Sequence, residues 1–398
     1  QDVTRINEEG EPEYVEPEDR PGFMSWWDYG FDQLLLGKHP TAADNFQNGY
    51  QFTGSVIAAQ NETEVISLMC ARLIEGDWKE NDRDFSEGMV EVLERHIGSD
   101  PNSTNSVEGL QDIYDHPGKY KRMVLANPDY YGHYIKITNQ NTKYAAAKGV
   151  MMRLGEEGVV SLYKDIREET GKSLRYFAVD YRLFPFSAQN TGIFYAPIKL
   201  ADRDIDDYLE YKVYAQENTQ GSNEDPQWAD YPDNPISMDK AEQEAERLGY
   251  KFRIRRYEMY YTEQFYDSMF YRTYVGYSPR DVGLPEDGKS VPGMQGEIRS
   301  MPAMQGWNMT HWKLVYKTMY YSELEEQNAS FPDDYTPLNY KEAISRYDEN
   351  GGDIKSGLGQ GTFYLKYYDG AIVSGQVKTE RGNPSPGVRV TVLDEYGI

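Results

Sequence analysis

The spacing of apolar residues changes near residue 207, and this change constrains the fold more than any other feature of the chain. Before it, apolar residues recur at helical intervals, as in Phe85, Met89 and Leu93. After it, apolar and polar residues alternate, which is typical of half-buried strands. The helical spacing predicts helices over about 55–75, 82–97, 106–127 and 140–154. The short apolar run 175–180 and the alternating segments 208–216, 250–261 and 311–321 predict strands, with one more helix at 237–248.

These patterns predict an α+β fold with an α-rich central core, small sheets and a β-rich insertion or peripheral region. The acidic stretch 1–20 has little apolar content and predicts an extended linker, so that order begins near Pro21. We expect the central core over 21–206 and a mixed insertion, or continuation of the core, over 207–355. A Gly-rich hinge at 351–361 predicts that a β-rich peripheral unit begins at 356 and continues to 398.

Composition excludes two classes of partner and one source of stability. The 398 residues include 41 Lys and Arg against 66 Asp and Glu, and the resulting net charge of -25 repels nucleic acids and anionic lipid heads. No run of 18 apolar residues is present. The single cysteine, Cys70, lies in an apolar segment and is predicted to be a buried thiol, so stability must come from packing.

The stretch Trp26-Trp27-Asp28 brings two indoles and a carboxylate together at one point. An ionised Asp28 only accepts hydrogen bonds, whereas each indole N–H only donates, so the three side chains complement a Ser or Thr hydroxyl from both sides. A pocket of this kind can reject a ligand without the hydroxyl by about 10^4 to 10^5. The alternative is an aromatic corner of the core in which Asp28 caps a helix that begins near Tyr29.

The pentapeptide Trp26-Trp27-Asp28-Tyr29-Gly30 matches the WWDYG signature of oligosaccharyltransferase catalytic subunits, which transfer a lipid-linked glycan to Asn in Asn-X-Ser/Thr sequons. The chain resembles the archaeal branch of this family over nearly its whole length. The segments that carry the resemblance, in the family's order, are ADNFQNG (43–49), AQNETE (59–64), RYFAVD (175–180), HWKLVY (311–316) and YYDGAIVSG (367–375).

The resemblance implies that Trp26, Trp27 and Asp28 bind the hydroxyl of the +2 Ser or Thr. A second family motif packs beside this pocket, and alignment on Phe194-Tyr195-Ala196 puts Ile193 at its central position. Its first and last positions are then Asn190 and Pro197, which both depart from the family's usual residues. Contact of Ile193 with the threonine methyl group would contribute about 0.8 kcal/mol and favour Thr over Ser.

The resemblance also implies features that this sequence does not include. In the family, catalytic carboxylates and a divalent metal, Mn or Mg, lie on an N-terminal membrane domain, so no metal is expected on this chain. The expected partners are an acceptor polypeptide and, through the membrane domain, a lipid-linked oligosaccharide. The chain is then an extracytoplasmic domain of a cell-membrane enzyme that recognises the acceptor and is inactive alone.

Two rival interpretations remain open: a Tyr-rich module that binds glycans or peptides, and a structural cell-envelope protein. Other motifs in the chain are weak. The acids at 202–207 lack the Gly and Glu of a calcium loop, Gly357-x-Gly359-x-Gly361 does not open a helix, and the five histidines lack metal-ligand spacing. Sequons occur at Asn61, Asn102, Asn308 and Asn328, and Asn102, in a polar loop, is predicted to be glycosylated.

Overall fold

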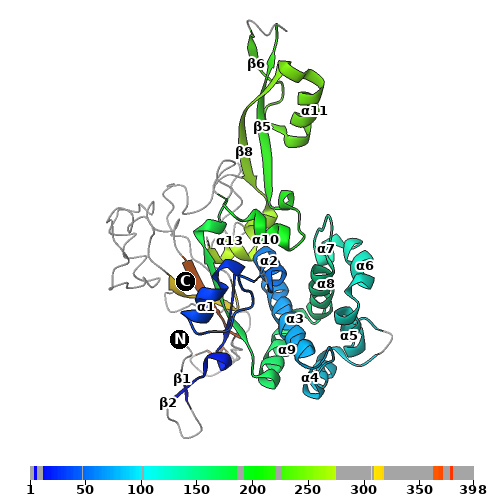
Figure 1. Cartoon of the computed structure of the whole chain (residues 1–398), viewed down its shortest axis with the longest axis vertical. Coiled ribbons are helices and arrows are strands. Elements are labelled where there is room, and N and C mark those ends of the chain that lie inside the picture. The colour runs from blue at the N-terminus through cyan, green and yellow to red at the C-terminus, as the bar shows by residue number, and fades with distance from the viewer. Residues whose placement is uncertain are drawn as a thin grey trace, which may run out of the picture. The chain divides into compact units, whose positions relative to one another are not determined.

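The computed structural model describes residues 4–6, 12–46, 48–100, 103–185, 192–220, 226–274, 306, 309–317, 362–370 and 377–379. The chain divides into two compact units, 1–368 and 369–398, and the following description concerns the first. Helices and small sheets are both present, so the fold class is α+β, as predicted (Figure 1). The sequons at Asn102, Asn308 and Asn328 lie outside the described residues.

The longest helices form a layer in which α3 packs against both α8 and α9. Side chains of the preceding residues begin several of these helices: Asn61 accepts a hydrogen bond at the start of α3, and Ser86 does so at α4. Ser106 and Thr138 cap α5 and α8 in the same way. The helices of this region are α2 (Tyr50–Ala58), α3 (Glu62–Glu80), α4 (Glu87–Ile97), α5 (Val107–Asp115), α6 (Lys121–Leu125), α7 (Pro128–Tyr131), α8 (Asn139–Met152) and α9 (Gly155–Thr170).

Three features of this region differ from the sequence prediction. The helix expected over 106–127 is interrupted after Asp115, because η3 (Pro117–Tyr120) separates α5 from α6. The single helix expected over 55–75 is two helices, because Ala59 is extended and the Asn61 side chain caps a new helix. Helix α9 was not predicted, although Val159, Leu162 and Ile166 follow a helical spacing and two acids occupy its first turn. These three apolar side chains are buried.

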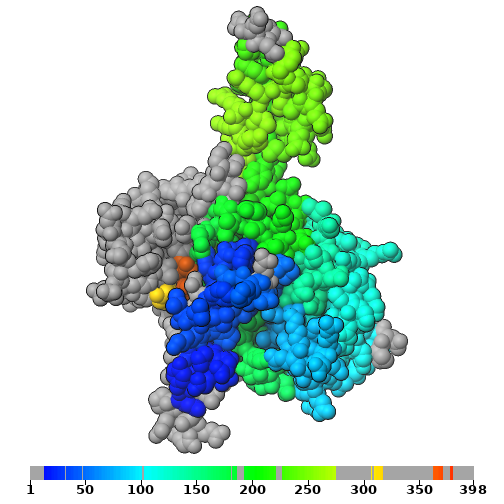
Figure 2. All heavy atoms as spheres, in the orientation of Figure 1, coloured from blue at the N-terminus to red at the C-terminus, as the bar shows by residue number. Residues whose placement is uncertain are grey.

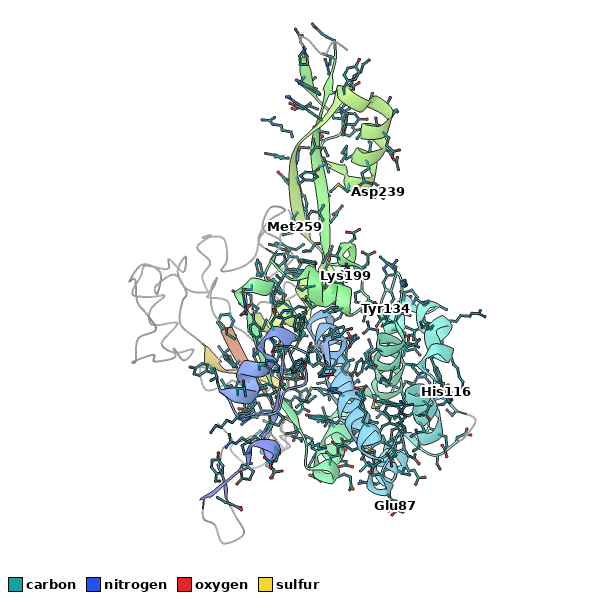
Figure 3. All side chains as sticks on the ribbon, in the orientation of Figure 1. Glu87, His116, Tyr134, Lys199, Asp239 and Met259 are labelled. Atoms are coloured by element: carbon teal, nitrogen blue, oxygen red, sulfur yellow. The ribbon has the colours of Figure 1, made fainter. Side chains whose placement is uncertain are left out.

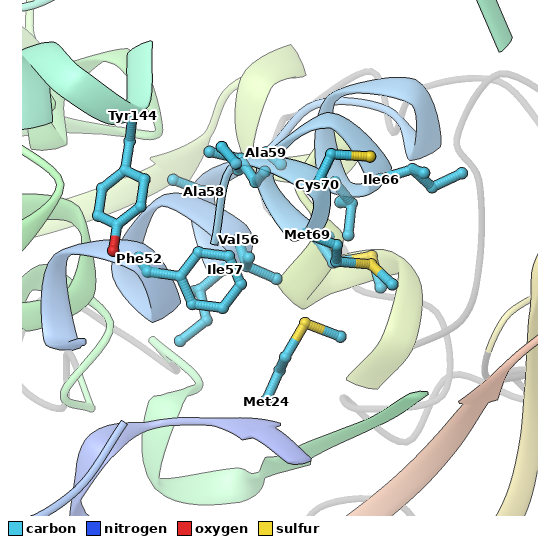
Figure 4. Close-up of a cluster of buried hydrophobic side chains, with 14 of the residues drawn as sticks. Met24, Phe52, Val56, Ile57, Ala58, Ala59, Ile66, Met69, Cys70 and Tyr144 are labelled. Carbon is cyan, nitrogen blue, oxygen red and sulfur yellow. The ribbon is translucent and has the colours of Figure 1, made fainter. Parts of the chain in front are cut away.

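The main core lies between these helices and the central sheet (Figure 4). Phe52 and Val56 from α2 and Met69 from α3 meet Met24, which comes from the first strand of that sheet, and all four are fully buried. Cys70 is a buried free thiol, which confirms the prediction. Burial raises the pKa of this thiol well above its usual value, so it stays protonated and inert.

The central sheet joins segments that lie far apart in the sequence. Its strands are β3 (Gly22–Ser25), β4 (Leu174–Asp180), β9 (Trp312–Lys317) and β10 (Thr362–Tyr367), in the order β3-β4-β10-β9. Strands β3 and β4 are parallel, whereas β10 is antiparallel to both of its neighbours. The predicted boundary at 356 is therefore wrong: β10 belongs to the central core, because its side chains Phe363, Leu365 and Tyr367 are buried there.

A second sheet is formed by β5 (Leu209–Asn218), β6 (Trp228–Asp230), β7 (Ile236–Ser237) and β8 (Phe252–Tyr261). The base of β5 and β8 belongs to the main core through Leu209 and Tyr261, and the rest packs with α11 (Met238–Leu248) around a small cluster that includes Val213 and Phe252. Figure 3 shows Asp239 on α11 and Met259 near the base of this sheet. The chain then returns to the core through α12 (Glu263–Asp267) and α13 (Met269–Tyr274).

Part of the acidic leader is folded, contrary to the prediction that order begins near Pro21. Strands β1 (Thr4–Ile6) and β2 (Pro12–Tyr14) pair, and η1 (Pro17–Asp19) follows. Arg20 is buried, and its guanidinium donates to the backbone oxygens of Val15 and Lys38. Figure 2 shows the described N-terminal residues, in dark blue, on the surface in view. A buried cation with two backbone acceptors ties the leader to the core, which composition alone did not indicate.

A buried charge network joins α3 to α8. The Glu75 side chain is fully buried and accepts from Lys143 Nζ at 2.5 Å, Tyr144 Oη at 2.6 Å and Arg72 Nη1 at 2.8 Å. Burial alone would raise the pKa of Glu75, but Arg72 and Lys143 outweigh it and hold that pKa far below its usual value. Glu75 is therefore ionised in the folded protein, where it pairs with Arg72 and Lys143 inside the helical layer and with the more exposed Lys79 at 3.2 Å.

Candidate functional site

The motif segment leaves the central sheet and turns directly into a short helix. Trp26 follows β3, η2 (Trp27–Tyr29) makes one tight turn, and α1 (Gly30–Leu35) continues from it. Buried Gln33 holds α1 against the strand: its side-chain amide donates to Ser25 Oγ at 2.8 Å, and its carbonyl oxygen accepts from Thr41 Oγ1 at 2.8 Å. These bonds fix the turn that carries the motif.

The structure brings Trp26, Trp27 and Asp28 together. Trp26 Nε1 donates to Asp28 Oδ2 at 3.2 Å, and the two indole rings lie 5.8 Å apart at 56°. Asp28 and Trp27 are both half-buried, whereas Trp26 is only 4% exposed. The Trp27 N–H is buried and has no hydrogen-bond partner. A buried donor without an acceptor costs about 1–3 kcal/mol, so an oxygen that reaches it would be stabilising.

This geometry changes the role expected for Trp26. Its N–H already donates to Asp28, so it orients the carboxylate and does not itself face a ligand. The alternative, an aromatic corner of the core with Asp28 as a helix cap, holds in part. Trp26 belongs to the main core and Trp27 packs against it, whereas the Asp28 carboxylate accepts from the Trp26 indole. The Asp28 carboxylate is the acceptor of the motif, and the buried Trp27 N–H is its donor without a partner.

The segment 43–49 holds the motif from the other side. Asn45 Nδ2 donates to the backbone oxygen of Asp28 at 3.0 Å, and Asn45 Oδ1 accepts from the Phe31 N–H at 3.2 Å. The backbone of Ala43 lies so close to Gly30 that a side chain there would collide with it. Gly30 is therefore required by the close approach of two segments, and not by its φ of -57°.

Tyr29 connects the motif to the end of β4. Its hydroxyl donates to Asp180 Oδ2, which also accepts from Arg182 Nε at 3.2 Å. The Arg182 guanidinium lies over the Tyr29 ring at 4.6 Å. Burial, together with the neighbouring Asp180 carboxylate, raises the pKa of Tyr29 well above its usual value. The phenol therefore remains a donor throughout the physiological pH range.

The three residues assigned to the second motif have different outcomes. Ile193 is half-buried, and its N–H donates to the carbonyl oxygen of Arg182 at 2.8 Å. Because the Arg182 guanidinium lies over the Tyr29 ring, Ile193 is linked to the motif through Arg182. Pro197 is buried in α10 (Tyr195–Leu200), where its carbonyl oxygen faces Gly54 of α2, so it is a packing residue and is not available to a ligand. Asn190 lies outside the described residues.

Asn45, Asp180 and Arg182 contact the motif, but sequence reasoning gave them no role. A signal was present for two of them, because Asn45 and Asp180 belong to segments 43–49 and 175–180 that carry the family resemblance. Their contact with the motif depends on long-range packing, which sequence spacing does not reveal.

Replacing Tyr29 with phenylalanine tests this support. Tyr29→Phe removes one donor from the Asp180 carboxylate, which is only 4% exposed, so we expect the free energy of unfolding to fall by about 1–3 kcal/mol. Urea denaturation measures the change. Tyr195→Phe, at a side chain in α10 that is 53% exposed, is the matched control and should stay within about 0.5 kcal/mol of wild type. Equal effects for the two variants would contradict the contact.

No family model, curated protein or solved structure matches the chain. Within the described ranges, no group of three or more His, Cys, Asp or Glu side chains is arranged to hold a metal ion. Asp202, from the acidic run 202–207, instead accepts from Thr138 N and Asn141 Nδ2, both at 2.6 Å. Across the same described ranges, none of the helices combines the length and apolar character needed to cross a bilayer.

Proposed function

We propose that the chain is the acceptor-recognition domain of an oligosaccharyltransferase, and that its motif binds the hydroxyl of Ser or Thr in an Asn-X-Ser/Thr sequon. The observation that supports this proposal is that an oriented carboxylate, Asp28, is next in the chain to an indole donor without a partner, Trp27. Trp26 fixes the Asp28 carboxylate, and the unpaired Trp27 N–H lies on the neighbouring residue. A hydroxyl donates to the first and accepts from the second.

In this mechanism the described residues bind and orient the acceptor. Asp28 receives the hydroxyl proton, Trp27 donates to the hydroxyl oxygen, and Ile193 contacts the methyl group of threonine. Tyr29 and Asn45 hold the turn from opposite sides. Glycan transfer belongs to the whole enzyme, which we propose acts at the cell membrane with this domain on the extracytoplasmic face. A lipid-linked oligosaccharide and a divalent metal, Mn or Mg, would be held outside this chain.

The proposal is tested by hydroxyl dependence in peptide binding to this chain. Three peptides that differ only at the +2 position, as Thr, Ser or 2-aminobutyrate, are titrated into protein labelled with 5-fluorotryptophan. Because a hydrogen bond to a charged group contributes about 1.5–3 kcal/mol, the aminobutyrate peptide should bind at least about tenfold more weakly than the Thr peptide. The Ser peptide should be weaker than the Thr peptide by about fourfold.

The 19F resonance of Trp27, assigned by Trp27→Phe, should shift most strongly because its N–H gains an acceptor. The resonance of Trp78, whose N–H already donates to Asp115 Oδ1 at 3.1 Å, is the internal control. Equal affinity for the Thr and aminobutyrate peptides would refute hydroxyl recognition by this motif.

A further inference from the structure

An exposed apolar patch begins at the edge of the motif. Leu35 is 73% exposed, Leu36 is 81% exposed and Phe46 is 77% exposed, and Leu34 is 41% exposed beside them. The Phe46 ring meets the edge of Phe31 with centroids 5.1 Å apart. We define the apolar patch as Phe31, Leu34, Leu35, Leu36 and Phe46. Soluble proteins seldom expose neighbouring large apolar side chains unless they bind something.

The orientation of α1 places Phe31 and Leu35 of the patch on one outward face. Gln33 faces the protein interior, where it bonds Ser25 and Thr41. Residues four apart share a helix face, so Phe31 and Leu35 lie together on the side of α1 that Gln33 leaves outward. Phe46 extends this surface through its contact with Phe31. The patch therefore spans α1 and the segment 43–49.

The patch and the hydroxyl site are held together by one side chain. Asn45 bonds the backbone of Asp28 and of Phe31, and Phe46 is the next residue along the chain. A ligand that contacts the Asp28 carboxylate thus needs only a short continuation to reach Phe31 and Phe46. This continuity, together with the net charge of -25, which disfavours an anionic lipid surface, favours the acceptor peptide as the occupant.

Resting on the function proposed above, we infer that the apolar patch is a subsite for an apolar side chain that follows the sequon in the acceptor. The sequon Asn must be presented to chemistry outside this chain, so the part of the peptide free to lie on the patch is the part beyond +2. In an extended peptide, side chains alternate and rise about 3.3 Å per residue. The +4 side chain therefore lies on the same side as the +2 hydroxyl, about 7 Å further along.

The test compares peptides with Leu or Ser at +4, each with Thr or 2-aminobutyrate at +2, by fluorescence polarisation on this chain. Leu at +4 should improve the affinity for wild type about fivefold, because half-burial of such a side chain supplies about that factor. Leu35→Ser and Phe46→Ser should each reduce this advantage to less than about twofold. Both variants should keep the preference for Thr at +2, since neither residue touches Asp28 through its side chain.

Ile135→Ser, at an apolar side chain that is 70% exposed and belongs to another part of the surface, is the matched control and should keep the Leu advantage. Hydroxyl dependence without any Leu advantage would overturn the subsite and leave the proposed function standing. Loss of hydroxyl dependence in wild type would overturn both. The last measurement is binding of the chain to phosphatidylcholine vesicles. If wild type binds the vesicles, Leu35→Ser does not, and Leu at +4 gives no advantage in peptide binding, the patch is a membrane-binding surface and the subsite is overturned.

Discussion

Replacing Asp28 with alanine is expected to abolish glycan transfer by the oligosaccharyltransferase proposed above, while the domain stays folded. The substitution removes the only carboxylate of the motif and leaves the Trp26 N–H without its acceptor. A hydrogen bond to a charged group contributes about 1.5–3 kcal/mol, so binding of an Asn-X-Thr peptide should weaken about tenfold to a hundredfold. Peptide titration and a transfer assay measure the two effects.

Asp28→Asn separates charge from shape. The amide oxygen can still accept from Trp26, but the carboxylate charge is gone, so we expect acceptor binding to fall and unfolding to be unchanged within about 1 kcal/mol. Asp239→Asn, at an exposed aspartate on α11, should alter neither quantity. Transfer to ordinary Asn-X-Thr peptides by Asp28→Ala would show that Asp28 does not have the role we propose.

Replacing Glu75 with glutamine is expected to lower the free energy of unfolding more than Tyr29→Phe or Asp28→Asn does. Glu75→Gln leaves Arg72 and Lys143 in the helical layer without the carboxylate that pairs with both. Breaking a buried ion pair from one side costs about 3–5 kcal/mol, because the remaining charge is buried and uncompensated. The midpoint of urea denaturation, followed by circular dichroism, measures the loss.

Glu80→Gln is the matched control, because it lies on the same helix but its ion pair with Lys172 is largely exposed, at 63% and 51% of the two side chains. Its effect should stay below about 1 kcal/mol. The folded pKa of Glu75 lies below the unfolded value, so its contribution is present above about pH 4.3 and is lost as the pH falls through the folded pKa. The difference between wild type and Glu75→Gln should therefore shrink in acid.

Local patterns predicted much of the helical half of the fold. Helix α11 lies where its pattern placed it, α4 ends at Ile97 as predicted but begins at Glu87 rather than near residue 82, and Cys70 is buried as its neighbours indicated. Two of the elements that were missed or misplaced are held by distant contacts. Helix α9 is stabilised by packing on α3, and β10 enters the central sheet between β4 and β9 although 182 residues separate Asp180 from its partner Thr362 (362 − 180).

The candidate site could also be predicted only where its residues are adjacent in the sequence. Residues adjacent in the sequence, Trp26, Trp27 and Asp28, could be recognised from their chemistry, and the structure brings their side chains together. The sequence could not show which of the two indole N–H groups donates to Asp28, because this depends on the side-chain rotamers of the motif. The supports Asn45 and Asp180 come from other segments, and Pro197 proved to be a packing residue, since α10 turns it toward Gly54.

The place of β10 in the central sheet has a consequence for biosynthesis. Until the ribosome has released residue 367, β4 has β3 on one side and an open row of backbone donors and acceptors on the other. The aspartate that will hold Tyr29 closes that same strand. Until β10 has been made, the strand that ends in the Asp180 acceptor of Tyr29 is therefore paired with β3 alone, and the motif gains its full scaffold only when β10 joins the sheet.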